Sequence, residues 1–202
     1  AKVNPNIILE FKTKSKNISH LLKTDIPKNV FVSWSLNPQI FIDNEEHGTA
    51  SLDQRFDSAK QLSDQGILVG FHCHPIVYYE GYENDYKNIV QKVMSMCHPS
   101  QIAMISMGTL TFIKPAINKL RSTGLKSKVL QIPMEDAVGK SSYTKEVKKE
   151  IFSNVYDEFS SWHEEIFFYL CMEESSIWET VFGDYYKSNS EFETALFESV
   201  SS

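Results

Sequence analysis

The sequence has no long hydrophobic segment and little cysteine. No run approaches the ~18 apolar residues that cross a bilayer, and residues 1–5 show none of the parts of a signal peptide. Only three cysteines occur in 202 residues, and an odd number at wide spacing excludes the disulfide framework of a small secreted domain. These absences predict a soluble protein with no membrane partner in a reducing, cytoplasmic setting.

Positive charge is scarce as well. Lysine and arginine number 20 against 26 acidic residues, which gives a formal net charge of -6. An acidic average excludes a surface that attracts nucleic acid over its whole area, but it leaves a local basic patch open. Neither a Gly-rich phosphate loop nor a nucleophile elbow is present. Hydrophobic residues make up 42% of the chain and aromatic residues 12%, enough for one sizeable core.

Apolar runs alternate with amphipathic stretches along the chain. The runs predict strands at residues 7–13, 30–36, 67–73, 102–107, 129–132 and 167–172. The amphipathic stretches predict helices at residues 15–22, 51–66, around 86–97, 112–121, 144–162 and 175–182. A long polar loop is expected at residues 37–50, and the polar tail 187–202 is expected to fray. This alternation is typical of parallel βα units, so the fold class is α/β, either a barrel or a doubly wound sheet.

The helix from residue 51 has the clearest sequence signals. Ser51 and Gln54 have the spacing of a capping box, and Gly66 is suited to close the helix. The following apolar stripe predicts the face that meets the core.

Several predicted strands are apolar on one face and polar on the other. The polar faces carry Glu10, Lys12 and Lys14 on the first strand, Ser33, Ser35 and Asn37 on the second, and Gly70, His72 and His74 on the third. Parallel strands buried on both faces are normally apolar throughout, so these positions predict one shared polar cavity toward the carboxyl ends of the strands. The alternative is the solvated face of an open sheet. A cation such as Lys14 in a cavity needs an anionic partner.

The pair His72 and His74 point to the same side of one strand, where two imidazoles can share a metal. That pattern resembles the metal-dependent hydrolases built on TIM barrels. A further ligand set is not evident, because His98 and His163 are isolated. We therefore favour two hydrogen-bonding pocket histidines over metal ligands.

Other candidates have two interpretations each. The loop Glu80 to Tyr82 is either a lid or a turn. Glu173 and Glu174 are either acids of the site or caps of the next helix, and we favour the capping role. Cys171 is interpreted as a core residue rather than a nucleophile. The polar stretch 136–143 either faces the substrate or only connects two elements.

An ordered series of motifs resembles the second half of the spore photoproduct lyase family, over residues 7 to 183. The motifs are LEFKTKS at 9–15, VSWSLNP at 32–38, GTASLDQR at 48–55, GFHCHPI at 70–76, EGY at 80–82, and YLCME at 169–173 followed by Trp178. Each motif is modestly specific alone, whereas their order and spacing together carry the resemblance.

The resemblance implies a radical S-adenosylmethionine enzyme. Residues 1–186 would form the C-terminal half of a partial (β/α)6 TIM-like barrel, which cleaves S-adenosylmethionine to a 5′-deoxyadenosyl radical for pyrimidine-dimer repair in DNA. At matching positions, Lys14 would contact the carboxylate of S-adenosylmethionine and Ser35 would hydrogen-bond it, with Asn37 and His74 nearby. The positions assigned to the substrate are His72, Glu80, Tyr82, Lys140 and Tyr143.

Two departures from the family pattern affect the expected activity. The C-x3-C-x2-C motif of the [4Fe-4S] cluster and the hydrogen-returning cysteine are expected upstream, in an N-terminal half of the same polypeptide, and Cys73, Cys97 and Cys171 do not supply three neighbouring thiolates. Close relatives also carry an arginine beside the tyrosine of the substrate-facing stretch, where this chain has Lys140-Ser141-Ser142-Tyr143, and this difference weakens the case for DNA as the substrate.

We therefore expect this chain alone to be inactive. Two alternatives stay open: a metal-dependent barrel hydrolase that uses His72 and His74, or a non-catalytic module that binds S-adenosylmethionine or nucleic acid. The sequence sets no oligomeric state, although an exposed edge at residues 7–13 offers a surface for dimerisation.

Overall fold

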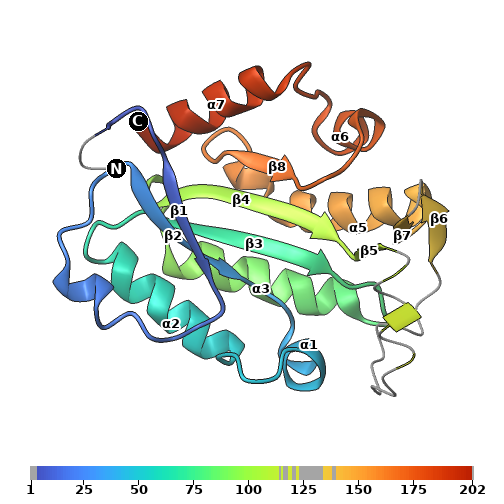
Figure 1. Cartoon of the computed structure of the whole chain (residues 1–202), viewed down its shortest axis with the longest axis horizontal. Helices are drawn as coiled ribbons and strands as arrows, with labels where there is room; N and C mark the ends of the chain where they lie inside the picture. The colour runs from blue at the N-terminus through green and yellow to red at the C-terminus, as the bar shows by residue number, and fades with distance from the viewer. Residues whose placement is uncertain are drawn as a thin grey trace.

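Five parallel strands form the main sheet of the protein, as the computed structural model shows (Figure 1). The structure describes residues 4–113, 115, 118, 119, 122, 134–137 and 140–201. Across the sheet the strands follow their order in the chain: β1 (Leu9–Thr13), β2 (Val30–Ser35), β3 (Val69–Ile76), β4 (Ile102–Thr109) and β8 (Phe168–Leu170). Every neighbouring pair is parallel. The predicted α/β class with a parallel sheet is confirmed.

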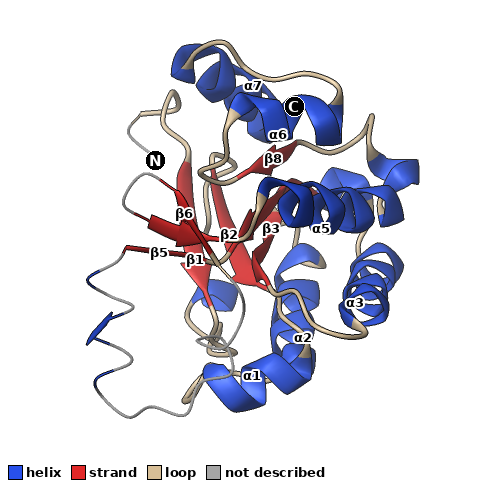
Figure 2. Ribbon diagram, turned by 90° about the vertical axis from the view of Figure 1, so that its right-hand side faces the viewer, coloured by secondary structure: helices blue, strands red, loops and turns tan. Residues whose placement is uncertain are grey.

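Three helices cover one face of this sheet (Figure 2): α2 (Leu52–Ser63), α3 (Tyr82–Met96) and α5 (Lys145–Glu158). The helix α6 (Ser175–Phe182) packs on α5. The predicted capping box is present, because the Ser51 hydroxyl accepts from the backbone of Gln54 and the Gln54 side chain accepts from the backbone of Ser51. Short 3-10 turns lie at Leu21–Lys23, Pro99–Gln101 and Ser160–Trp162.

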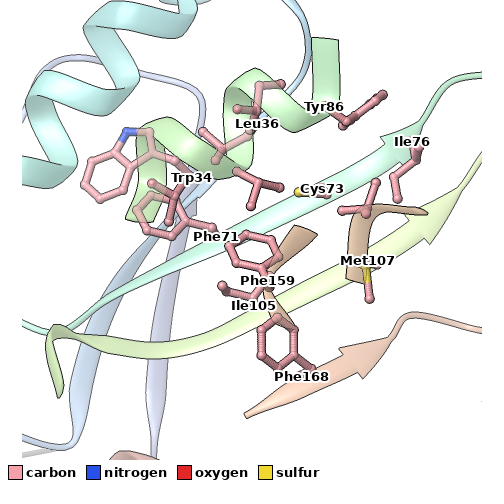
Figure 3. Close-up of a cluster of buried hydrophobic side chains, with 14 of the residues drawn as sticks. Trp34, Leu36, Phe71, Cys73, Ile76, Tyr86, Ile105, Met107, Phe159 and Phe168 are labelled. Carbon is pink, nitrogen blue, oxygen red and sulfur yellow. The ribbon is translucent and has the colours of Figure 1, made fainter. Parts of the chain in front are cut away.

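The main core lies between the sheet and these helices (Figure 3). Trp34, Phe71 and Ile105 project from neighbouring strands and are fully buried. Phe159, just beyond α5, and Phe168 on β8 complete the cluster with ring centroids 5.5 Å apart. Burying a side chain of this size stabilises the fold by roughly 1.5–3 kcal/mol. The strand face that the sequence marked as apolar is thus the face that meets the helices.

On the opposite face, α7 (Asn189–Ser201) packs on β4. Val200 lies against Phe31, Ala103 and Met104 in a second hydrophobic cluster. The hydroxyl of Ser199 donates to the carbonyl of Ala103 at 3.4 Å. The expectation of a frayed tail is therefore wrong for residues 189–201, because a few apolar contacts hold a largely polar helix in place.

Two further predictions near the chain start are wrong. Residues 15–20 form no helix, since Thr13 and Ser15 side chains accept backbone N–H groups two residues further on, both at 3.0 Å, and such local bonds compete with helix formation. The predicted loop at residues 37–50 contains α1 (Gln39–Glu45). Ile42 of α1 is buried, and the Gln39 side chain accepts from the Leu52 N–H at 2.7 Å. Tertiary contacts therefore stabilise this short helix.

A small antiparallel sheet lies beyond the carboxyl ends of β3 and β4 (Figure 1), in the order β5 (Thr111–Ile113), β7 (Lys140–Ser142) and β6 (Glu135–Ala137). The predicted helix at residues 112–121 is wrong at its start, because Phe112 and Ile113 pair with β7. The predicted strand 129–132 lies outside the described residues. Among the described residues, no helix is long and apolar enough to cross a membrane.

Candidate functional site

The polar strand faces that the sequence predicted lie side by side, on the surface of the sheet that faces away from α2, α3 and α5. The register sets Lys12 beside Ser33, Ser35 beside His72, and His72 beside Ser106. Adjacent parallel strands bring residues of one face together along the sheet. The polar face is thus one surface shared by β1, β2, β3 and β4.

His72 is the centre of this surface and is only 3% exposed. Its Nε2 lies 2.6 Å from a Glu10 carboxylate oxygen and 3.1 Å from the Ser33 hydroxyl, while its Nδ1 contacts the Ser106 hydroxyl. The Ser33 hydroxyl also donates to Glu10. Since a carboxylate only accepts hydrogen bonds, Nε2 carries the proton and Nδ1 accepts from Ser106. The imidazole therefore joins four strands through side-chain hydrogen bonds.

The charges on this surface follow from burial and from these bonds. Burial raises the pKa of Glu10, but hydrogen bonds from His72 and Ser33 outweigh it and hold that pKa below its usual value. Burial lowers the pKa of His72, and the Glu10 carboxylate only partly opposes this. Burial and then the charge of Lys12 lower the pKa of His74 to about 4. At neutral pH, Glu10 is ionised and both histidines are neutral.

A second polar cluster lies beyond the carboxyl ends of β1 and β2. A carboxylate oxygen of Glu46 lies 2.7 Å from Lys14 Nζ and accepts from the Asn37 amide at 2.7 Å, while the other lies 2.6 Å from Arg55 Nη2. Arg55 is fully buried and also donates to the Ser35 carbonyl at 2.8 Å. One carboxylate thus balances two cations, so the cluster has one surplus positive charge.

The surplus charge borders a cavity of about 540 Å³. Its lining comes from the segment after β1 and from the segment that leads into α2: Thr13, Lys14, Ser15, Lys16, Asn17, Gly48, Thr49, Ala50 and Gln54. The Lys14 side chain is 36% exposed, whereas that of Glu46 is 5% exposed. An anion that enters this cavity would meet Lys14 rather than the buried carboxylate.

Acid is expected to weaken the fold through Glu46. Burial raises the pKa of Glu46, but hydrogen bonds from Lys14, Arg55 and Asn37 lower it by more than burial raises it. The pKa in the folded protein therefore lies below the ordinary value. The carboxylate therefore contributes stability above the unfolded pKa of about 4.3, and this contribution is lost as the pH falls through the folded value. In urea titrations between roughly pH 6 and pH 2, the stability difference between wild type and Glu46→Gln should shrink as the pH falls. A constant difference would contradict this prediction.

The four residues assigned to S-adenosylmethionine occupy different environments. Lys14 lines the cavity, and His74 is half-buried on the polar face. Ser35 and Asn37 are buried, and Asn37 also accepts from the Tyr86 hydroxyl at 3.3 Å. The His74 ring lies against Gly108, where a Cβ atom would be 2.8 Å from His74 Cδ2. Any residue with a Cβ atom at position 108 of β4 would clash with the His74 ring, so glycine leaves the room that the ring needs.

The five residues assigned to the substrate do not form one cluster. His72 lies on the polar face, but the Tyr82 ring is buried and its hydroxyl accepts from the Asn154 amide at 2.6 Å, against α5. The Tyr143 ring is also buried, and its hydroxyl accepts from the Tyr78 N–H at 3.1 Å. Glu80 and Lys140 are exposed. The positions of Tyr82 and Tyr143 indicate core packing.

The acids after β8 have structural partners. The Glu173 side chain is 4% exposed and lies 2.8 Å from Lys148 Nζ, while it accepts from the Thr109 hydroxyl at 3.0 Å. Glu174 occupies the N-cap position of α6 and lies 2.5 Å from Lys145 Nζ. Glu174 thus stands at the start of α6, as the favoured interpretation expects, but its side chain makes no capping hydrogen bond, and Glu173 pairs with Lys148 instead.

The cysteines do not fit an iron–sulfur cluster. Cys73 and Cys97 are buried, Cys171 is half-buried, and all three are free thiols. Burial raises the pKa of Cys73 to about 12. Among the described residues, no group of three or more histidine, cysteine, aspartate or glutamate side chains can hold a metal ion. His72 also uses both ring nitrogens for hydrogen bonds.

Sequence reasoning missed Glu46 and Arg55, the residues that organise the second cluster. Arg55 lies three residues after Leu52 and four before Ala59, so it falls on the apolar stripe of α2. A charged residue on a buried stripe was the available signal, since such a residue needs a buried partner. Glu46 offered no comparable pattern, because it lay in a segment expected to be a loop.

Parallel strands with helices on one face and a polar surface on the other define this chain as an α/β protein with a candidate site on its sheet. A family model described as spore photoproduct lyase matches residues 4–161. The chain belongs to the spore photoproduct lyase family of radical S-adenosylmethionine proteins.

Curated relatives agree with this assignment. A spore photoproduct lyase of Clostridium acetobutylicum is 27% identical over 139 residues, which cover 66% of this chain and 38% of the relative. One from Bacillus subtilis is 33% identical over 85 residues, or 42% of this chain and 25% of the relative. The matched part thus spans well under half of these relatives.

Solved structures share the fold. A spore photoproduct lyase variant with bound AdoMet and dinucleoside spore photoproduct has a TM-score of 0.68 at 22% identity, covering 81% of this chain and 51% of that one. Another variant has a TM-score of 0.71 at 23% identity, with the same coverage. The chain spans about half the length of these structures.

Proposed function

We propose that this chain is the S-adenosylmethionine- and substrate-binding half of a radical S-adenosylmethionine enzyme for DNA repair. The observation that carries the proposal is the surplus positive charge at Lys14, fixed by the buried Glu46 and Arg55 pair beside a cavity. The family membership supports it, as does the related protein whose structure holds AdoMet and a dinucleoside spore photoproduct. The proposed substrate is a photoproduct in DNA, and the proposed location of the protein is the cytoplasm.

We propose that residues 1–186 belong to a partial (β/α)6 barrel. The strand order supports this, because the strands follow the chain order without the reversal of a doubly wound sheet. The placement of α2, α3 and α5 on one face also supports it, since barrel helices lie outside and the polar strand face lies inside.

The residues beside the cavity fit the amino-acid end of S-adenosylmethionine. Lys14 has three N–H donors, so it can keep Glu46 and also bind the ligand carboxylate. Asn37 and Arg55 act indirectly, because they hold Glu46 in place from buried positions. Bound S-adenosylmethionine would supply a 5′-deoxyadenosyl radical. The cysteines of this chain do not fit the [4Fe-4S] cluster of the family, which we propose belongs to an N-terminal half of the same polypeptide.

The polar face would serve the substrate side of the site. Glu10 accepts the hydrogen bond from Nε2 of His72, which keeps the proton on that nitrogen and turns the imidazole toward β1. The ionised, partly exposed Glu10 carboxylate would provide acceptors beside Lys12, whereas both ring nitrogens of His72 are occupied. Metal ligation by His72 and His74 in a hydrolase is not favoured, because both nitrogens of His72 already have protein partners.

Replacing Lys14 by alanine is expected to weaken S-adenosylmethionine binding by about 10- to 100-fold, the range of one charge-assisted hydrogen bond. Titration calorimetry of this chain with S-adenosylmethionine measures the effect. Lys23→Ala is the matched control, since Lys23 is exposed outside the cavity. Unchanged affinity in Lys14→Ala, with normal circular dichroism, would contradict the assigned role of Lys14. Failure of the wild-type chain to bind S-adenosylmethionine would overturn the proposed function.

A further inference from the structure

A cavity of about 400 Å³ lies at the carboxyl end of β8, between that strand, α6 and α7. It falls in the segment after residue 161, where the family match ends. Its volume is in the range of roughly 300–1,000 Å³ that small-ligand pockets have. Five of its thirteen lining residues are aromatic: Tyr169, Trp178, Tyr185, Tyr186 and Phe192.

Four of these rings, Tyr169, Trp178, Tyr186 and Phe192, form a connected cluster of edge-to-face contacts. Phe192 of α7 lies 5.4 Å from Tyr169, 5.5 Å from Tyr186 and 6.4 Å from Trp178, measured between ring centroids. Tyr185 and Tyr186 are nevertheless 40% and 37% exposed. Rings held by neighbours but open to solvent suit the stacking of another planar ring, at little cost in side-chain ordering.

The remaining lining adds hydrogen-bonding groups and a cation. Ser175, Ser188 and Asn189 offer donors and acceptors, and Lys187 is exposed beside Tyr186. The buried acid of the lining, Glu173, is already paired with Lys148 at 2.8 Å. A planar ring with polar edges and a nearby negative charge matches this combination better than a purely apolar ligand does.

The cavity adjoins the polar face of the sheet through β8. Tyr169 lines the cavity and lies beside Ser106 in the register of β4 and β8, and Ser106 contacts His72. Cys171, two residues on, lines the cavity too. A ligand that occupies the polar face can therefore place an adjacent group in the cavity.

We propose that this aromatic cavity binds a nucleobase of a single-stranded nucleic acid next to the reacting nucleotide, with Lys187 near its phosphate. The inference deepens the proposed function, because it names a subsite for the strand that the polar face would process. Stacking between bases and aromatic side chains tolerates any base sequence.

Tryptophan fluorescence provides the test. The chain has three tryptophans; Trp34 and Trp162 are buried, and Trp178 lines the cavity. A short oligothymidylate should quench the tryptophan fluorescence of the wild-type chain and of Trp162→Phe, but this quenching should be lost in Trp178→Phe.

The affinity of variants provides a second test. Tyr186→Ala should bind the oligonucleotide about 5- to 100-fold more weakly, whereas Phe11→Ala, on the opposite sheet face, should bind normally. Lys187→Gln should reduce the slope of log affinity against log salt concentration by about one, because one phosphate contact is lost.

Equal binding of an abasic oligonucleotide, or unchanged affinity in Tyr186→Ala, would overturn the inference. Free thymidine monophosphate should bind more weakly than the oligonucleotide, and the reverse result would identify a mononucleotide site and also overturn it. Titrations of the wild-type chain separate the two proposals. If the wild-type chain binds S-adenosylmethionine but shows no base-dependent oligonucleotide binding, only the cavity proposal is removed, and the opposite pattern removes only the proposed function. Tyr186→Ala should bind S-adenosylmethionine normally.

Discussion

Replacing Arg55 by methionine is expected to lower the free energy of unfolding by about 3–5 kcal/mol, because it leaves the buried Glu46 carboxylate without its fully buried cationic partner. Arg55 is fully buried, and it also donates to the Ala50 carbonyl at 3.0 Å and the Thr49 hydroxyl at 2.8 Å. For a chain of this length the melting temperature should fall by roughly 6–20 °C. Urea unfolding and thermal melts measure both quantities.

The same helix provides a matched control. Lys60→Met removes the exposed pair with Asp64, which should change stability by less than about 0.5 kcal/mol. The double variant Arg55→Met with Glu46→Gln should lose less than the sum of the single losses, since it removes both charges together. A loss below about 1 kcal/mol in Arg55→Met would show that the pair does not organise this cluster.

Replacing Trp34 by alanine is expected to cost about 3–5 kcal/mol, the usual range for removing a large aromatic side chain from a core. Trp34 is fully buried on β2, and its Nε1 donates to the Ser15 carbonyl at 2.9 Å (Figure 3 shows the ring). Trp34 therefore ties the main core to the segment that carries Lys14. Urea unfolding monitored by circular dichroism measures the loss.

Trp34→Phe separates packing from the hydrogen bond. It keeps most of the apolar ring but leaves the Ser15 carbonyl without its donor, so a smaller loss of about 1–2 kcal/mol is expected. If the Lys14 segment binds S-adenosylmethionine as proposed, this variant should also bind it more weakly while remaining folded. Phe11→Ala, a half-exposed aromatic residue, should change stability by less than about 1 kcal/mol. Similar losses in Trp34→Ala and Phe11→Ala would contradict the central place of Trp34.

The regular part of the fold was predictable because its signals are local. The alternation of Val32 and Trp34 with Ser33 and Ser35 correctly separated the helix-facing side of β2 from the polar side. The spacing of Ser51 and Gln54 located the start of α2, because both bonds of a capping box form within one turn. The helix at 175–182 was predicted with the bounds that the structure has.

The irregular parts depended on contacts that no local pattern carries. The helix α1 is held by buried Ile42 and by the bond between Gln39 and Leu52, thirteen residues away. The tail helix α7 is anchored through Val200 to strands far earlier in the chain. The burial of Tyr82 against Asn154 of α5 also depends on a contact between distant segments, which the loop motif at residues 80–82 does not indicate.

The sequence by itself determined the parallel α/β fold, the side of the sheet that carries polar residues, and the family. These features depend on residue periodicity and on ordered motifs, which are properties of the chain alone. Only the tertiary structure decided which polar residues act together. Glu10 and His72 meet at 2.6 Å across β2, and Glu46 reaches Arg55 at 2.6 Å from a different element. Hydrogen bonds and ion pairs act over a few ångströms in space, so their partners are set by strand register and packing rather than by sequence spacing.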